Sequence, residues 1–119
     1  MVIQQGDLFW VRLEMDDEAD SIPHPQVVLQ DTVLNQSRLP TVVVCSLTTN
    51  LKRASLPGNL LLEAGEGNLP RPSVVEVAKV SSVHKDHLGA YIGRLSEARV
   101  QQIFEGMRFL QRTYFRGQG

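Results

Sequence analysis

The chain has 119 residues, of which 42% are hydrophobic and 21% are charged, and its formal net charge is −1. These values indicate one folded domain with an apolar core, and they exclude a disordered chain. They also exclude nucleic-acid binding through an overall basic field, so any such contact requires a local patch.

Short apolar and β-branched runs, separated by turn residues, follow one another along most of the chain. They predict strands at 8–13, 26–30, 41–47, 59–63, 73–80 and 90–95. In the first strand, Leu8 and Trp10 should face one side, and Phe9 and Val11 the other. The segments 14–20 and 31–40 are expected to be polar loops, and 83–88 a turn or short helix.

One strong helix is predicted near the end of the chain. Ser96 is a suitable N-cap, and Gly106 should weaken the helix by up to about 1 kcal/mol. Apolar side chains at helical spacing form one core-facing stripe: Val100, Ile103, Phe104, Met107 and Leu110. The order of elements indicates a mainly β (α+β) domain, an antiparallel barrel or strongly curved sheet with the helix packed against it. We expect this domain at residues 1–112 and a tail at 113–119.

The single cysteine, Cys45, lies inside an apolar run, which indicates a buried side chain in a reducing compartment. No signal peptide or membrane-spanning run is visible, so we expect a cytoplasmic protein. His84 and His87 have a spacing that suits a metal, but no cysteine lies nearby, and surface histidines are the preferred interpretation. We therefore expect no metal and no cofactor.

The third strand ends in Thr48, Thr49 and Asn50. These residues are either a polar strand exit that satisfies its own turn or part of a site. The prolines around His24 favour extended backbone, so His24 would open the second strand. If the two strands are antiparallel neighbours, His24 and Thr48 lie at the same edge of the sheet. With the cations Lys52 and Arg53, they would suit the binding and cleavage of a phosphodiester.

Four blocks of the sequence, at 5–11, 23–29, 41–50 and 65–75, resemble in this order the MazF/PemK family of toxin endoribonucleases. The resemblance implies a small SH3-like antiparallel β-barrel with a C-terminal helix, usually a homodimer. It further implies metal-independent cleavage of single-stranded RNA, often mRNA, through attack of the 2′-hydroxyl on the adjacent phosphate. A disordered antitoxin segment normally blocks the dimer groove in this family.

The resemblance also assigns roles to residues. Thr48 matches the family's catalytic threonine, whereas His24 stands where the family has a catalytic arginine, and it could act as a general acid or base. Lys79 could replace some of the lost positive charge. The expected substrate-binding set is Thr49, Asn50, Lys52, Arg53 and Lys79. Two alternatives remain open: a catalytically degenerate member that binds protein or RNA, and a topoisomerase-directed toxin like CcdB, which shares the fold.

Overall fold

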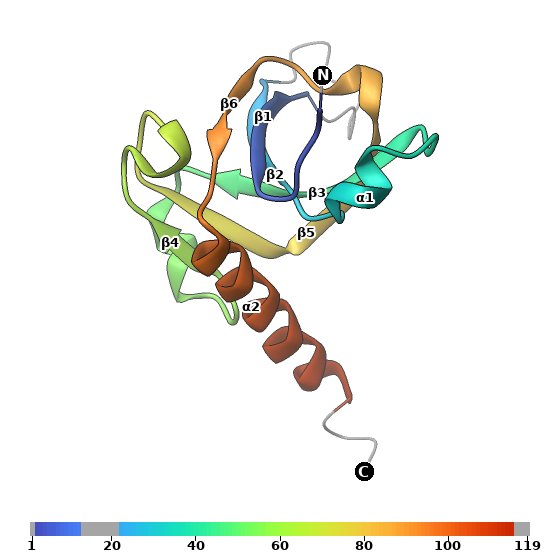
Figure 1. Cartoon of the computed structure of the whole chain (residues 1–119). Coiled ribbons are helices and arrows are strands. Elements are labelled where there is room, and N and C mark those ends of the chain that lie inside the picture. Colours follow the sequence, from blue (N-terminus) through green and yellow to red (C-terminus); the bar gives the residue numbers. More distant parts are fainter. Residues whose placement is uncertain (1, 13–21, 116–119) are drawn as a thin grey trace.

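The computed structural model describes residues 2–12 and 22–115, and its backbone is a strongly curved sheet with a long helix against it (Figure 1). The strands are β1 (Asp7–Val11), β2 (His24–Val28), β3 (Thr41–Thr48), β4 (Leu60–Leu62), β5 (Ser73–His84) and β6 (Tyr91–Arg94). They form one sheet in the order β4-β5-β3-β2-β1-β6, and each neighbouring pair is antiparallel. The mainly β, SH3-like fold with a C-terminal helix is confirmed. The acidic run 14–20 lies outside the described residues.

Alternating side chains give the curved sheet two apolar faces. Leu8 and Trp10 pack with the cluster that contains helix residues Val100 and Ile103, which confirms the predicted facing of the first strand. The second cluster fills the other face and contains Ile3, Phe9, Val11, Val28, Val42, Val44 and Val83. With apolar contacts on both faces, the central strands are held rigidly, and the positions of residues at their ends are fixed.

The C-terminal helix α2 (Glu97–Phe115) lies against the sheet and projects beyond it (Figure 1). Its N-terminus is capped as predicted, because Ser96 Oγ accepts a hydrogen bond from the Arg99 amide at 3.2 Å. The predicted apolar stripe is confirmed, with Val100 and Ile103 buried and the other three residues partly buried. The helix continues to Phe115 and so includes the first three residues of the segment expected as a tail.

The loop between β4 and β5 connects one edge of the sheet to the other elements. Its short 3₁₀ segment η2 (Glu66–Asn68) lies beside β6, where the Asn68 side-chain amide donates to the Ile92 carbonyl oxygen at 3.0 Å. Arg99 of α2 donates two hydrogen bonds to the Glu66 carboxylate, at 2.7 and 2.9 Å. The loop therefore ties the β4 edge to both β6 and the helix.

Most predicted strand boundaries differ from the observed ones by one or two residues, and two larger differences concern the segment 31–40 and the end of β5. The expected loop 31–40 contains a short helix, α1 (Thr32–Asn35), because Asp31 Oδ1 caps it by accepting from the Val33 amide at 2.8 Å. Strand β5 continues beyond residue 80 to His84, since Val83 pairs with Val42 and is buried in the second cluster. The expected turn at 83–88 is therefore reduced to the 3₁₀ segment η3 (Lys85–His87). None of the described helices is long and apolar enough to cross a bilayer.

Candidate active site

The ends of β2 and β3 bring the two predicted catalytic residues to one edge of the sheet. The strands are antiparallel neighbours, with Gln26 opposite Ser46 and Val27 opposite Cys45. Continuing this register by two residues puts His24 across from Thr48. His24 is exposed, and Thr48 is half-buried. The sequence-based expectation that these strands are antiparallel neighbours is confirmed.

His24 and Thr48 also point to the same face, because residues directly opposite each other on paired antiparallel strands lie on the same face of the sheet. Gln26 lies two residues after His24 on β2. It is completely buried and donates through Nε2 to Ser46 Oγ of β3 at 3.2 Å. Gln26 Oε1 has no hydrogen-bond partner among the described residues. From the sequence, Gln26 was predicted only as a strand residue; its place between the apolar residues Pro25 and Val27 is the signal that could have identified it.

The turn after β3 is stabilised by its own side chains. Thr48 Oγ1 accepts from the Asn50 amide, and Asn50 Oδ1 accepts from the Lys52 amide, both at 3.2 Å, at the start of the 3₁₀ segment η1 (Leu51–Ser55). These bonds are those expected of a polar strand exit that satisfies its own turn. Thr48 can still take part in a site, because a hydroxyl that accepts a hydrogen bond keeps its own proton for donation. Thr49 and Lys52 are exposed beside it.

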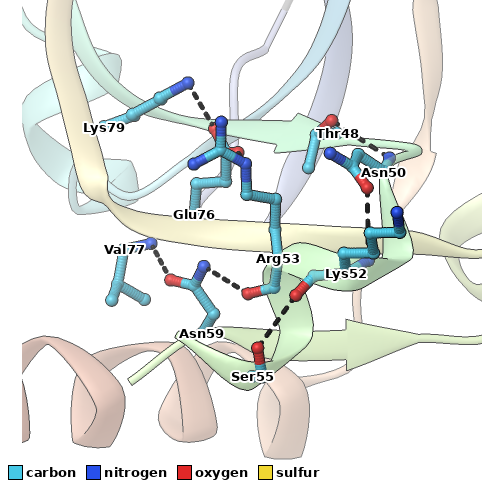
Figure 2. Close-up of polar contacts among 9 residues, drawn as sticks. All are labelled: Thr48, Asn50, Lys52, Arg53, Ser55, Asn59, Glu76, Val77 and Lys79. Atoms are coloured by element: carbon cyan, nitrogen blue, oxygen red, sulfur yellow. Dashed lines mark hydrogen bonds and ion pairs between the residues drawn. The ribbon is translucent and has the colours of Figure 1, made fainter. Parts of the chain in front are cut away.

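A buried carboxylate that the sequence did not reveal lies beside this turn. Glu76 of β5 is 5% exposed, and both Arg53 and Lys79 point toward it (Figure 2). Lys79 Nζ lies 3.0 Å from Glu76 Oε2, and Arg53 Nε lies 3.9 Å from Oε1. Two of the predicted substrate-binding cations therefore meet at one anion. The signal in the sequence was a single acidic residue inside the run Val74 to Val77.

An irregularity in the β3–β5 pairing explains how Glu76 comes to this place. Cys45 pairs with Val80 but Leu47 pairs with Val75, so the residues from Glu76 to Lys79 bulge out opposite Ser46. Cys45 Sγ donates to the Glu76 carbonyl oxygen at 3.1 Å. Burial, with the nearby Glu76 charge, raises the pKa of Cys45 to about 12. This confirms Cys45 as a buried side chain, and such a thiol does not act as a nucleophile at neutral pH.

Asn59 links the η1 segment to the same part of β5. Its Nδ2 donates to the Arg53 carbonyl oxygen at 2.9 Å, and its Oδ1 accepts from the Val77 amide at 3.0 Å (Figure 2). The side chain thus fixes the backbone of Arg53 relative to the residue after Glu76. No local pattern marks such a bridge, because both of its partners are backbone groups and one of them, the Val77 amide, lies on β5.

The two other histidines lie apart from this edge, around η3. His84 Nδ1 accepts from the Asp86 amide at 3.1 Å, and the rings of His84 and His87 are 5.7 Å apart. Within the described ranges, no three His, Cys, Asp or Glu side chains are arranged to hold a metal ion. A surface depression of about 620 Å³ lies at the start of α2, where its lining includes Gln4, Arg94 and Ser96 but none of the predicted site residues.

Comparison with known proteins extends these observations. Residues 4–110 match the family described as the PemK-like, MazF-like toxin of type II toxin–antitoxin systems. The chain is 32% identical over 111 residues to endoribonuclease MazF2 of Mycobacterium bovis, covering 91% of this chain and 96% of the relative.

Solved structures agree with the fold. A MazE–MazF crystal structure from Deinococcus radiodurans superposes with a TM-score of 0.76 at 17% identity, covering 93% of this chain and 96% of that one. A mycobacterial endoribonuclease in complex with its cognate antitoxin superposes with a TM-score of 0.68 at 18% identity, with 89% of each chain covered. From the match over most of its length and the relationship to MazF2, the chain belongs to the PemK-like, MazF-like family of toxin endoribonucleases of type II toxin–antitoxin systems.

Proposed function

We propose that this chain cleaves single-stranded RNA, chiefly mRNA in the cytoplasm, without a metal ion, as the toxin of a toxin–antitoxin pair. The observation that carries the proposal is that His24 and Thr48 lie at the same end of the neighbouring strands β2 and β3, with the cations of η1 beside them. An imidazole and a hydroxyl supply proton transfer and hydrogen bonding, and the cations supply positive charge for a phosphate. The endoribonuclease names of the relatives support the same reaction class.

The proposed reaction is an internal transfer within the RNA. The 2′ oxygen bonds to the adjacent phosphorus while the bond from phosphorus to the 5′ oxygen breaks. The 2′-hydroxyl loses a proton and the leaving 5′ oxygen gains one, and His24 exchanges one of these protons. Thr48 Oγ1 donates a hydrogen bond to a phosphate oxygen. Thr49 and Asn50, just before η1, and Lys52 and Arg53 within it contact the RNA strand, and Lys79 lies beside them.

The direct test incubates the purified chain with a long single-stranded RNA in the presence and absence of EDTA. We expect cleavage at the same rate in both, with products that carry a 2′,3′-cyclic phosphate and a 5′-hydroxyl. Binding of RNA without cleavage would instead favour the catalytically degenerate alternative. Inhibition of a topoisomerase without RNA cleavage would favour the CcdB-like alternative.

The partners in this proposal are a second copy of the chain and a cognate antitoxin peptide. Apolar side chains exposed on both edge strands, Leu61 on β4 and Tyr91 on β6, support association through an edge. The similar mycobacterial endoribonuclease was solved in complex with its cognate antitoxin, which supports an antitoxin partner here. Light scattering at micromolar concentration should report twice the chain mass of 13.3 kDa. A monomer at that concentration would contradict the homodimer.

A further inference from the structure

The buried carboxylate of Glu76 requires compensation, and two cations provide it unequally. An ionised side chain that is removed from water needs a paired charge and hydrogen bonds. Lys79 Nζ is within hydrogen-bond distance of Oε2, at 3.0 Å, whereas Arg53 Nε is beyond that distance from Oε1, at 3.9 Å. Lys79 therefore neutralises Glu76 most directly. The carboxylate orients the Arg53 side chain but is too distant to accept a hydrogen bond from its Nε.

The guanidinium of Arg53 keeps its donors available. Its side chain is 48% exposed, and it has no hydrogen-bond acceptor in residues 2–12 and 22–115. A guanidinium carries five N–H donors in a planar fork that matches two oxygens of a phosphate. A lysine ammonium bound to Glu76 offers less, because its charge is already paired. Of the two cations, Arg53 is the one prepared for a further anion.

The backbone of Arg53 is fixed by hydrogen bonds on both sides of the residue. Asn59 connects the Arg53 carbonyl to the Val77 amide, directly after Glu76 (Figure 2). At the other side, the Arg53 amide donates to the Asn50 carbonyl oxygen at 3.1 Å. Glu76 and Asn59 therefore fix the two ends of one residue relative to β5. Such preorganisation lets a charged donor stabilise a transition state without first reorganising.

We propose that Arg53 binds the scissile phosphate, that Glu76 and Asn59 are its positioning residues, and that Lys79 is the counter-ion of Glu76 and not an RNA ligand. This proposal rests on the proposed ribonuclease function. During transfer, Arg53 donates to the non-bridging phosphate oxygens, where negative charge accumulates, and takes no part in the proton transfers. The positive charge needed at the phosphate is thus supplied from η1, next to the Thr48 edge.

The test measures kcat and KM on a single-stranded RNA for full-length variants, with thermal unfolding to confirm the fold. Arg53→Gln should lower kcat by roughly 10²-fold or more, the usual scale for a donor to the transition state. Arg53→Lys keeps the charge but loses the fork, so kcat should fall by a smaller factor. Arg108→Gln, a change at an exposed cation of α2, is the matched control and should retain wild-type kinetics.

Lys79 gives the sharpest discrimination. In Lys79→Gln, Glu76 retains only Arg53 as partner and draws it away from the phosphate, so kcat should fall. The double variant Glu76→Gln/Lys79→Gln removes that competition, so kcat should rise above that of Lys79→Gln but stay below wild type, because Arg53 then lacks its positioning carboxylate. If Lys79 binds RNA, the double variant will not recover, KM will rise, and the slope of log KM against log salt will fall by about 0.7, as for one lost contact with single-stranded nucleic acid.

Asn59→Ala tests the backbone anchor. It should lower kcat with little change in KM, and its effect should disappear in an Arg53→Gln background, because both changes act through the same group. Equal kcat for Arg53→Gln and wild type, or an Asn59 effect that is independent of Arg53, overturns this proposal while ribonuclease activity stands. A wild-type chain that cleaves no RNA overturns the proposed function itself, and this proposal with it.

Discussion

The Asn50 amide donates a hydrogen bond to Thr48 Oγ1 at 3.2 Å, so the turn that follows β3 orients the hydroxyl at its end. Thr48 is half-buried, while Leu47 beside it belongs to the core. The contribution of Thr48 to folding is therefore one turn hydrogen bond, and its hydroxyl proton is free for another acceptor. Folding and catalysis can be separated at this residue by substitution.

For Thr48→Ala we expect RNA cleavage to fall by about 10²-fold or more, because a donor to the reacting phosphate is lost. The free energy of unfolding should fall by only about 1 kcal/mol, the scale of one hydrogen bond. Thr48→Ser, the control, keeps a hydroxyl and should keep most of the activity. The measurements are initial cleavage rates and urea denaturation. A Thr48→Ala chain that does not fold would show that this residue serves only the strand exit.

His24 should contribute directly to cleavage, because an imidazole can exchange a proton with the reacting groups. His24→Ala should lower the rate by around 10²-fold, as for the loss of one acid–base group. His24→Arg supplies a permanent charge that can clamp a phosphate and should raise the rate. The measurement is the initial cleavage rate of the three proteins on the same RNA. Equal rates for wild type and His24→Ala would remove His24 from the mechanism.

Gly106→Ala should destabilise the chain, against the usual gain of about 1 kcal/mol for this change in a helix. A Cβ at Gly106 would collide with the Gly58 carbonyl oxygen, and one at Gly58 would lie 2.5 Å from the Gly106 oxygen. Neither backbone can retreat easily, so we expect a loss of about 1–3 kcal/mol, typical of overpacking. Urea denaturation measures it. Glu105→Ala, at an exposed neighbouring position, is the control and should change stability by under about 0.5 kcal/mol.

The Arg99–Glu66 pair should make stability sensitive to acid. Hydrogen bonds from Arg99 lower the pKa of Glu66 from its ordinary value of 4.5, and partial burial opposes this shift. A carboxyl whose pKa is lower in the folded state stabilises the fold above its unfolded pKa, and this contribution is lost as pH falls through the folded value. Arg99→Gln should therefore cost up to about 1 kcal/mol at pH 7.

That cost should begin to shrink below about pH 4.5, where Glu66 of the unfolded chain takes up a proton, and it should be lost at the lower pH at which Glu66 of the folded wild type is protonated. Denaturation of wild type and Arg99→Gln at several values between pH 7 and pH 2 measures the difference. A Glu66→Gln/Arg99→Gln double variant, which has no pair left to titrate, should show the same pH dependence as Glu66→Gln alone. A constant difference between wild type and Arg99→Gln at every pH would contradict the assigned pair.

Local patterns were sufficient to predict the strands and the helix. The alternation of Leu8, Phe9, Trp10 and Val11 follows the two faces of a strand, and the α2 stripe follows the helical period. The extension of β5 was missed because Ser81 and Ser82 interrupt the apolar run. Their pairing with β3 depends on a strand that lies more than thirty positions earlier in the chain. Tertiary pairing there outweighs local preference.

The sequence predicted the part of the candidate site that depends on two neighbouring strands. His24 and Thr48 were assigned to one edge because antiparallel neighbours bring opposite strand ends together. The burial of Glu76 and the bridge from Asn59 could not be derived in this way. Both depend on the bulge in β5 and on backbone groups that the fold alone brings together.

The buried thiol of Cys45 gives this chain an internal reporter of opening. It is the only cysteine, it is completely inaccessible in the fold, and its pKa of about 12 leaves almost no thiolate at neutral pH. An alkylating reagent can therefore modify the chain only when the core around Cys45 opens. Separation of β3 from β5 is one such opening, and it would displace Glu76 from the turn beside Thr48. The rate of alkylation would therefore set an upper limit on how often the site comes apart, without any label or substitution.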